Sequence, residues 1–303
     1  MRVRFGMMAD AHVEFMHDGA ERVATFLAAC EREGCDFCVD LGDFCPPGRT
    51  NEEQKEKIRE MLRRFPLPFY HILGNHDTDE NTKAASLAYI GCEDQPRSFD
   101  CGGVHFVLLD ACAFAEGKRE LDYDNGNYRR SRGLMPILPR RELKFLERDL
   151  AEAKCPAVLF SHQSLIESRT GIRNAPALRR VIENAPNGVL LSVCGHEHVD
   201  RLQMQGGVYY LCLNSMSYYW AGENYKHETY GGAIDADYPM LKMTFPYRDP
   251  LFAIVQITDE EIRVMGRESQ IVGAKPQDLS FKKSGLRDEI TASISDRILP
   301  IRK

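Results

Sequence analysis

Five short polar motifs carry residues that can bind metal ions or transfer protons. They are Asp10-Ala11-His12, Gly42-Asp43, Gly74-Asn75-His76-Asp77, Ser161-His162 and Gly195-His196-Glu197-His198. Carboxylate, amide and imidazole groups suit Mn, Fe, Zn, Co or Ni, and no thiolate belongs to the set. One carboxylate can also join two cations through its two oxygens, so the motifs favour a site for a pair of metal ions.

Each motif comes at the end of an apolar run that has the length and composition of a β-strand. The predicted strands are Arg2–Ala9, Asp36–Leu41, Phe69–Leu73, Val104–Asp110, Ala157–Ser161 and Val189–Cys194. Amphipathic helices are predicted between them at Gly19–Glu33, Asn51–Arg64, Pro139–Ala153 and Ala175–Asn184. This alternation is typical of a layered α/β domain. Because such sheets bind ligands beyond the carboxyl ends of their strands, the motifs are expected to converge on one cleft.

Beyond Cys194 the pattern changes to strands with short turns and no intervening helix. These strands are predicted at Val199–Gln205, Gly207–Leu213, Leu251–Thr258 and Glu261–Met265. The change indicates two packed sheets with helices outside. We expect a domain over residues 1–265 that carries inserts at 113–138 and 215–250, followed by a C-terminal extension at 266–303. Asp288–Leu299 is a candidate short helix in that extension.

The bulk properties limit the class of partner. The chain has 303 residues, a net charge of -6 and ordinary hydrophobic and charged fractions of 43% and 28%. An acidic balance argues against a general binder of nucleic acid or of anionic membranes. We expect a cytoplasmic protein, because no leader-like segment and no run of 18 apolar residues occurs. The ten cysteines show no repeated CxxC pair, so reduced, structural cysteines are predicted.

The five motifs, in this order, resemble those of the calcineurin-like metallophosphoesterases, and the resemblance covers roughly residues 1–213. It implies a four-layer sandwich of two facing mixed β-sheets flanked by helices, with the active site at the strand C-terminal ends. It also implies that one ion is bound by Asp10, His12, Asp43 and His198. The second ion would be bound by Asp43, Asn75, His162 and His196, so Asp43 would bridge the pair.

The implied reaction is hydrolysis of a phosphate ester. Two cations lower the pKa of a shared water enough to give hydroxide near neutral pH, and this hydroxide attacks phosphorus. His76 matches the family position that contacts the phosphate or protonates the leaving oxygen, and Asp77 is a candidate to orient it. The remaining histidines are interpreted as structural or solvated: His17, His71, His105 and His227.

Departures from well-known branches of the family narrow the range of expected substrates. Protein Ser/Thr phosphatases carry Gly-Asp-x-x-Asp-Arg-Gly, whereas Pro46 occupies the second Asp position and Pro47 the Arg position here, and Leu73 precedes Gly74 where those enzymes have Arg. Purple acid phosphatases need a tyrosine at the position of Pro46. The chain is more similar to class III cyclic-nucleotide phosphodiesterases and manganese-dependent ADP-ribose or CDP-alcohol hydrolases. We therefore expect phosphodiesterase or phosphomonoesterase action on a small soluble, nucleotide-like phosphorylated substrate.

Two other functions compete with this interpretation. A non-catalytic scaffold is conceivable on the same fold, as in the retromer subunit that resembles this family but lacks part of its metal set. The complete ligand set disfavours that alternative here. A nuclease is disfavoured by the acidic balance and by the lack of an obvious basic stripe.

Several residues keep two interpretations. Asp40 is left out of the ligand set because the alternation of strand faces makes its direction ambiguous. The run of Arg129, Arg130 and Arg132 is a candidate grip for a second phosphate or a solvated face. The aromatic cluster Tyr218-Tyr219-Trp220 could stack on a base or sugar, or form buried core or a homodimer contact.

Overall fold

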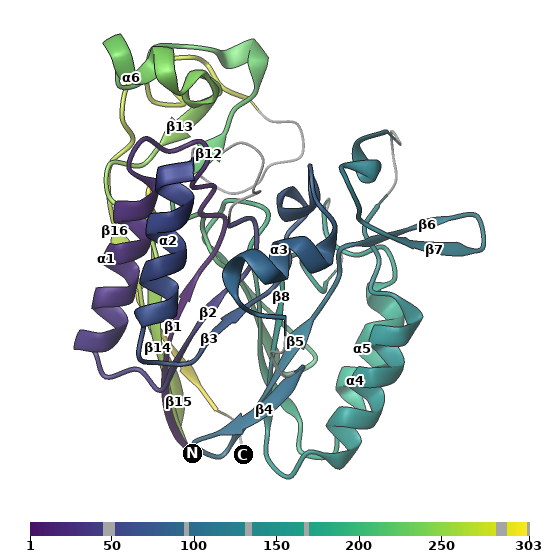
Figure 1. Ribbon diagram of the computed structural model, residues 1–303. Coiled ribbons are helices and arrows are strands. Elements are labelled where there is room, and N and C mark those ends of the chain that lie inside the picture. Colours follow the sequence, from purple (N-terminus) through teal and green to yellow (C-terminus); the bar gives the residue numbers. More distant parts are fainter. Residues whose placement is uncertain (45–51, 94–96, 131–134, 167–169, 283–289, 302–303) are drawn as a thin grey trace.

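Two six-stranded mixed sheets face each other at the centre of the computed structural model (Figure 1). The structure describes residues 1–44, 52–93, 97–130, 135–166, 170–282 and 290–301. Asn51, the predicted start of a helix, lies outside the described residues, as do Cys45, Pro46, Pro47 and Arg132.

The first sheet contains the N-terminal strand at its centre. Its order is β18 (Arg297–Pro300), β15 (Glu261–Met265), β14 (Ala253–Thr258), β1 (Arg2–Met8), β2 (Phe37–Asp40) and β3 (Phe69–His71). Strands β1, β2 and β3 run parallel, whereas β14, β15 and β18 pair antiparallel. The carboxyl ends of β1, β2 and β3 therefore lie at the same edge of the sheet.

The second sheet is also mixed, with a different arrangement of its strands. Its order is β10 (Arg201–Gln205), β11 (Val208–Cys212), β9 (Val189–Cys194), β8 (Ala157–Ser161), β5 (Val104–Leu109) and β4 (Ser98–Cys101). The four inner strands are parallel, and the two outer strands pair antiparallel. Strands β8 and β9 bring the last two histidine motifs to one edge.

The main core fills the space between the sheets. Phe5 and Phe37 of the first sheet stack with centroids 5.0 Å apart, and the Phe106 ring of the second sheet meets both edge-on at 5.4 Å and 4.9 Å. Such edge-to-face contacts are favourable between aromatic rings. Because these side chains come from alternate positions of each strand, the facing sides of both sheets are apolar.

Helices cover the outer faces of both sheets (Figure 1). Helix α1 (Gly19–Arg32) buries Val23, Phe26, Leu27 and Cys30, the spacing of one helical face, and packs with α2 (Glu52–Arg64) on the first sheet. Helices α4 (Arg140–Glu152) and α5 (Ala175–Glu183) cover the second sheet. Helix α3 (Lys83–Ile90) lies between the two sides. The predicted four-layer α/β sandwich is confirmed.

The two inserts contain elements that the sequence did not predict. The 113–138 insert forms a hairpin of β6 (Ala113–Glu116) and β7 (Arg119–Asp122), which projects from the body, and a 3-10 turn, η2 (Asn127–Arg130). The 215–250 insert pairs β12 (Tyr218–Trp220) with β13 (Thr244–Pro246) and contains η3 (Glu223–Tyr225), α6 (Gly232–Asp237) and η4 (Pro239–Met243).

The tail differs from its prediction. Where a helix was expected over Asp288–Leu299, the described part has β17 (Ser293–Ile294), which pairs with β16 (Arg267–Glu268), and β18. The helix prediction was wrong because Ile294 and Leu299 are buried in the inter-sheet core instead. In addition, β18 pairs with the edge strand β15 and supplies hydrogen-bond partners for its backbone. The boundary expected after residue 265 stays a prediction.

Candidate metal centre

All seven predicted ligand residues meet where β1, β2, β3, β8 and β9 end. Asp10, His12 and His198 form one group, and Asp43, His162 and His196 form another, with the candidate ligand atoms of each group within 4.8 Å of one another. Asn75 joins the second group, because its Oδ1 lies 3.2 Å from His162 Nε2. The structure thus brings the predicted residues together from loops far apart in the sequence.

Asp43 lies between the two groups. Its Oδ2 is 3.2 Å from His162 Nε2 and 3.8 Å from His12 Nε2. Its Oδ1 accepts a hydrogen bond of 2.7 Å from the backbone N–H of His76. Asp10 is held similarly, because its Oδ2 accepts from the His196 backbone N–H at 2.9 Å while its Oδ1 lies 3.2 Å from His198 Nε2.

The backbone of these loops is unusual. Five of the candidate ligands have left-handed φ angles: Asp10 (50°), His12 (43°), Asp43 (55°), His196 (70°) and His198 (54°). A residue with a Cβ adopts this region only at a cost on the order of 1 kcal/mol or more. The left-handed residues turn the loops after β1, β2 and β9 sharply at the strand end, so that the ligand side chains return toward the common centre.

Glycines allow these loops to pack against one another. A Cβ on Gly74 would overlap the backbone nitrogen and Oδ1 of Asp43. A Cβ on Gly195 would lie 2.6 Å from Asp10 Oδ2. The glycines of these motifs are therefore needed for close approach of one ligand loop to the next.

The second nitrogen of three histidines faces an oxygen atom of the protein. Nδ1 of His162 donates to the Leu41 carbonyl at 2.8 Å, and Nδ1 of His198 donates to the Tyr218 carbonyl at 2.7 Å. These bonds leave Nε2 of both rings facing the centre. Nδ1 of His12 lies 3.5 Å from Glu14 Oε1. Metal-binding histidines are commonly oriented in this way, so the donor set fits a pair of transition-metal ions.

Glu14 was missed by sequence reasoning. Its side chain is 1% exposed, and neither carboxylate oxygen has a hydrogen-bond partner among the described residues. A carboxylate this deeply buried is costly unless positive charge lies nearby. The only signal in the sequence is its position two residues after His12, which places both side chains on the same turn.

The electrostatics of the site follow from burying acids and imidazoles together. Burial by itself raises the pKa of Asp43, but His162 and neighbouring imidazoles outweigh it and hold that pKa well below 3.8. Burial by itself lowers the pKa of His162, but Asp43 outweighs it and raises the value to about 10. Burial and the neighbouring His162 lower the pKa of His196 to about 4. The ionised carboxylates thus attract positive charge, which metal ions can supply in place of protons.

His76 lies at the accessible side of the centre. Its side chain is 34% exposed, at the start of the 3-10 turn η1 (His76–Thr78), and its Nδ1 is 2.8 Å from Asp79 Oδ2. The residue beside the ring is therefore Asp79, and the expectation that Asp77 orients His76 was wrong. Asp77 points away because its carboxylate accepts backbone hydrogen bonds of 2.9 Å, 2.9 Å and 2.7 Å from Asp43, Phe44 and Gly74.

Asp40 and His71 support the loops from behind. Both side chains are fully buried, with His71 Nδ1 2.6 Å from Asp40 Oδ2 and His71 Nε2 3.5 Å from Asp77 Oδ2. Asp40 is thus paired with His71 and is not in either ligand group. The structural interpretation of His71 agrees with this burial. Its contact with Asp77 links it to the carboxylate that holds the Gly42–Phe44 turn.

The structure bears differently on the aromatic and arginine residues that had two interpretations. Tyr218 and Tyr219 are each 1% exposed and belong to the buried alternative, while Trp220 is 37% exposed. Arg129 forms an ion pair with Asp79. The side chain of Arg130 is outside the description.

The pattern of the calcineurin-like phosphoesterase family matches residues 3–200, and the chain belongs to that family. No curated protein matches the chain in sequence. A dimetal phosphatase from Danio rerio has a similar structure, with a TM-score of 0.67, 13% identity and coverage of 99% of both chains. GAP50, the anchor in the inner membrane complex of Plasmodium, gives a TM-score of 0.56 and 14% identity over 100% of this chain and 90% of its own.

Family membership supports metal-dependent phosphoester hydrolysis with a dinuclear metal centre as the class of activity. The structural likenesses show the shared fold. Within the described residues, no helix is long and apolar enough to cross a membrane.

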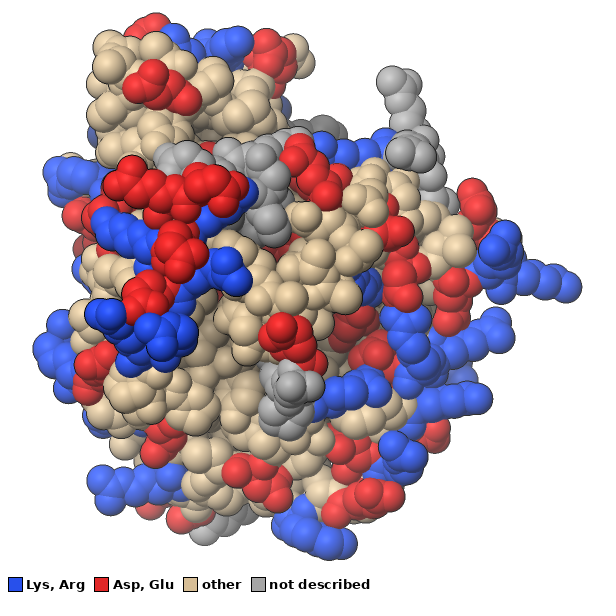
Figure 2. All heavy atoms as spheres, in the orientation of Figure 1, with Lys and Arg blue, Asp and Glu red and all other residues tan. Residues whose placement is uncertain are grey.

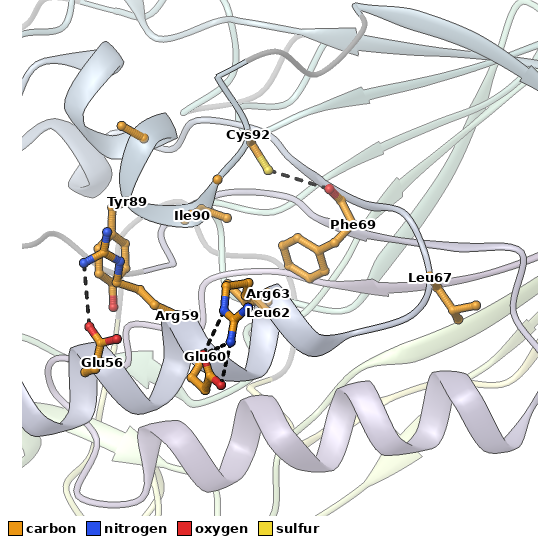
Figure 3. Close-up of a pocket in the computed structure, with 12 residues that line it drawn as sticks. Glu56, Arg59, Glu60, Leu62, Arg63, Leu67, Phe69, Tyr89, Ile90 and Cys92 are labelled. Atoms are coloured by element: carbon orange, nitrogen blue, oxygen red, sulfur yellow. Dashed lines mark hydrogen bonds and ion pairs between the residues drawn. The ribbon is translucent and has the colours of Figure 1, made fainter.

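A hollow of about 520 Å³ lies apart from this centre, between α2 and α3 (Figure 3). Charged side chains of α2 line it in pairs, with Arg63 bonded to Glu60 and Arg59 close to Glu56. Its lining contains none of the candidate ligands. Because its charges already neutralise one another, we assign it no chemical role.

Proposed function

We propose that this protein hydrolyses a phosphoester of a small soluble, nucleotide-like molecule at a centre of two metal ions. The observation that carries the proposal is the pair of adjoining ligand groups with Asp43 between them. One ion would be held by Asp10, His12, Asp43 and His198. The other would be held by Asp43, Asn75, His162 and His196.

The donor chemistry suits manganese, iron or zinc, since the groups offer carboxylate, amide and imidazole ligands without thiolates. Two such ions would supply Lewis acidity toward the phosphoryl oxygens and would lower the pKa of a water molecule for attack on phosphorus. The protein's own contribution is to hold its ligands before the ions arrive. The hydrogen bonds to Leu41 and Tyr218 and the neighbouring Glu14 serve this purpose.

His76 is the residue we assign to the leaving group. Its Nδ1 faces Asp79, so its Nε2 is the atom that can hydrogen-bond a phosphoryl oxygen or give a proton to the leaving oxygen. Its exposure allows contact with a substrate that the more deeply buried histidines lack. A positioned proton donor of this kind is worth roughly 10²–10⁴ in rate.

Surface charge supports a small-molecule substrate over nucleic acid. On the face drawn in Figure 2, Lys and Arg are interspersed with Asp and Glu, and the net charge of the chain is -6. Binding along a nucleic-acid backbone depends mainly on clustered Lys and Arg. We also propose a cytoplasmic location, because the described cysteines are free and a reducing compartment keeps them so.

A non-catalytic partner-binding role is the alternative, since a structural neighbour is an anchor protein. The complete ligand set argues for catalysis, because a scaffold has no need of seven converging ligands or of strained loops.

The test is an activity screen of the purified protein with Mn²⁺, Fe²⁺ or Zn²⁺. It uses aryl phosphates, an aryl phosphodiester, cyclic nucleotides and nucleoside diphosphate derivatives, with Asp43→Ala as the control. We expect hydrolysis that is lost in Asp43→Ala. Metal binding without hydrolysis of any of these compounds would contradict the proposed substrate class, and no metal binding would contradict the centre itself.

A further inference from the structure

A loop of the 113–138 insert is docked beside His76. The backbone N–H of Gly126 donates to the Thr78 carbonyl at 2.8 Å, and that of Asn125 donates to the Asn81 carbonyl at 3.0 Å. These bonds attach the insert to the segment that follows the Gly-Asn-His-Asp motif. The side chains after Gly126 are thereby brought to the metal centre.

Tyr128 is the first of these side chains. Its hydroxyl lies 3.3 Å from Asn75 Nδ2, which donates to it, and donates in turn to Asp79 Oδ1 at 2.5 Å. On the opposite side of the same amide, Asn75 Oδ1 faces His162. An amide can bind a metal ion only through its oxygen, and the Tyr128 hydroxyl stabilises the orientation that points this oxygen to the centre.

Asp79 connects Tyr128 to His76. Its side chain is 1% exposed, and its carboxylate contacts the His76 ring through Oδ2 and Tyr128 through Oδ1, with Arg129 also paired to Oδ2. Burial by itself raises the pKa of Asp79, but the hydrogen bonds from His76 and Tyr128 and the charge of Arg129 lower it. A single ionised carboxylate thus receives donors from both the insert and the catalytic loop.

We propose that Tyr128 is a positioning residue that couples the ligand Asn75 to the proton donor His76, with Arg129 holding the shared Asp79. The inference rests on the proposed function and assigns part of its machinery to the insert. The Tyr128 hydroxyl orients the Asn75 amide toward the second ion. Through Asp79 it also orients the His76 ring toward the leaving group. Residues that orient metal ligands typically change metal affinity or activity by about 10–100-fold when removed.

Tyr128→Phe tests the role of the hydroxyl because it keeps the ring. That ring stacks on Tyr123 at a centroid distance of 4.7 Å, so the packing of the loop is retained. Tyr123→Phe is the matched control. It removes a hydroxyl from the same pair of rings, and among the described residues no hydrogen bond joins the Tyr123 hydroxyl to Asn75 or Asp79.

The first measurement is Mn²⁺ binding by titration calorimetry, which requires no turnover. We expect one of the two binding steps to lose about 10-fold in affinity in Tyr128→Phe, with Tyr123→Phe like the parent protein. Equal affinities in all three proteins would overturn the coupling to Asn75. Because no substrate is needed, this result is independent of whether the proposed phosphoesterase activity is found.

The second measurement compares kcat for phenyl phosphate and p-nitrophenyl phosphate. Phenoxide is the poorer leaving group and depends more on proton donation, so displacement of His76 should lower its hydrolysis more. We expect Tyr128→Phe to lower kcat by about 10-fold for phenyl phosphate and by less for p-nitrophenyl phosphate. Equal losses on both esters would overturn the coupling to His76, because a loosened fold would slow both alike.

Discussion

The ligand loops and the two long inserts supply the same site in different ways. Each ligand loop is a short turn at a strand end, and in the loops of Asp10, Asp43 and His196 left-handed residues direct the side chains to the centre. The inserts supply partners for those side chains, through the Tyr218 carbonyl on His198 and the Tyr128 hydroxyl on Asn75. The loops thus fix which atoms can bind metal, and the inserts fix how those atoms are held.

The centre therefore depends on two kinds of contact. The ligand loops depend on close packing between neighbouring motifs, where even an added Cβ atom would clash with the next loop. The inserts depend on single hydrogen bonds that can be removed one at a time. Substitutions in the ligand loops should therefore lower metal binding and activity far more than substitutions of the partner residues in the inserts.

Gly74→Ala should have the largest effect. The added methyl group overlaps the backbone nitrogen of Asp43 and must displace the residue that lies between the two groups. We expect loss of tight binding of both ions and at least a ~10³-fold fall in activity, since each ion supplies several kcal/mol of transition-state stabilisation. Metal analysis and steady-state kinetics check this, and a variant that still binds two ions tightly would contradict the packing argument.

Glu14→Gln should have the next largest effect. The substitution removes the charge beside His12 while keeping the size of the side chain, so the ring loses its anionic partner. We expect the affinity for the first ion to fall by about 10–100-fold. Mn²⁺ titration measures this, and Glu53→Gln on the exposed face of α2 is the control. An equal response of the two variants would exclude a role for Glu14 in the centre.

Gly126→Ala should produce a smaller loss by loosening the insert. Gly126 has a φ of 66°, and a Cβ there would lie 2.8 Å from the Asp79 carbonyl oxygen. We expect about a 10-fold fall in kcat, as for other residues that act through a ligand's partner. Gly117→Ala is the matched control, because Gly117 is in the same insert with a φ of 60° and nothing within 4 Å of its added Cβ. If both variants lose activity equally, backbone strain and not docking of the insert is responsible.

His105→Gln should have the smallest effect, on stability alone. Burial favours the neutral ring, but hydrogen bonds with Asp149 at 2.8 Å and Asp100 at 2.6 Å outweigh it and raise the pKa of His105 above 6.5. The protonated ring therefore stabilises the fold fully below about pH 6.5, and this contribution is lost as the pH rises through the raised pKa.

We expect the parent protein to exceed His105→Gln in the free energy of unfolding by less than about 1 kcal/mol at pH 6, since Asp100 is well exposed. The difference should shrink at pH 9. Denaturant melts at the two pH values measure it. A difference that grows with pH would reverse the assigned sign.

The sequence predicted the ligand loops well because their chemistry is local. A strand followed at once by Asp, Asn or His leaves few places for the side chain to point, and parallel strands bring such ends together. The grouping of His12 and His198 with Asp10 was implied by the resemblance to the family, although His198 is far along the chain. The two facing sheets followed from the change, beyond Cys194, to strands with short turns and no intervening helix.

The partners could not be predicted because they depend on long-range packing. Nothing local distinguishes Asp79 from Asp77 as the residue beside His76; the structure assigns Asp77 to backbone amides instead. Glu14 and Tyr128 act only through contacts made after the chain has folded. The prediction of a helix in the tail was wrong for a related reason. Residues 297–300 form a strand because they pair with the open edge of β15.

The central claim is a pair of ions joined by Asp43, and anomalous diffraction from crystals grown with Mn²⁺ tests it most directly. We predict two peaks, one among Asp10, His12, Asp43 and His198 and one among Asp43, Asn75, His162 and His196. Their separation should be about 3.5–4 Å, the spacing at which two ions can act on one phosphoryl group. A single peak, or two peaks that do not share Asp43, would contradict the account.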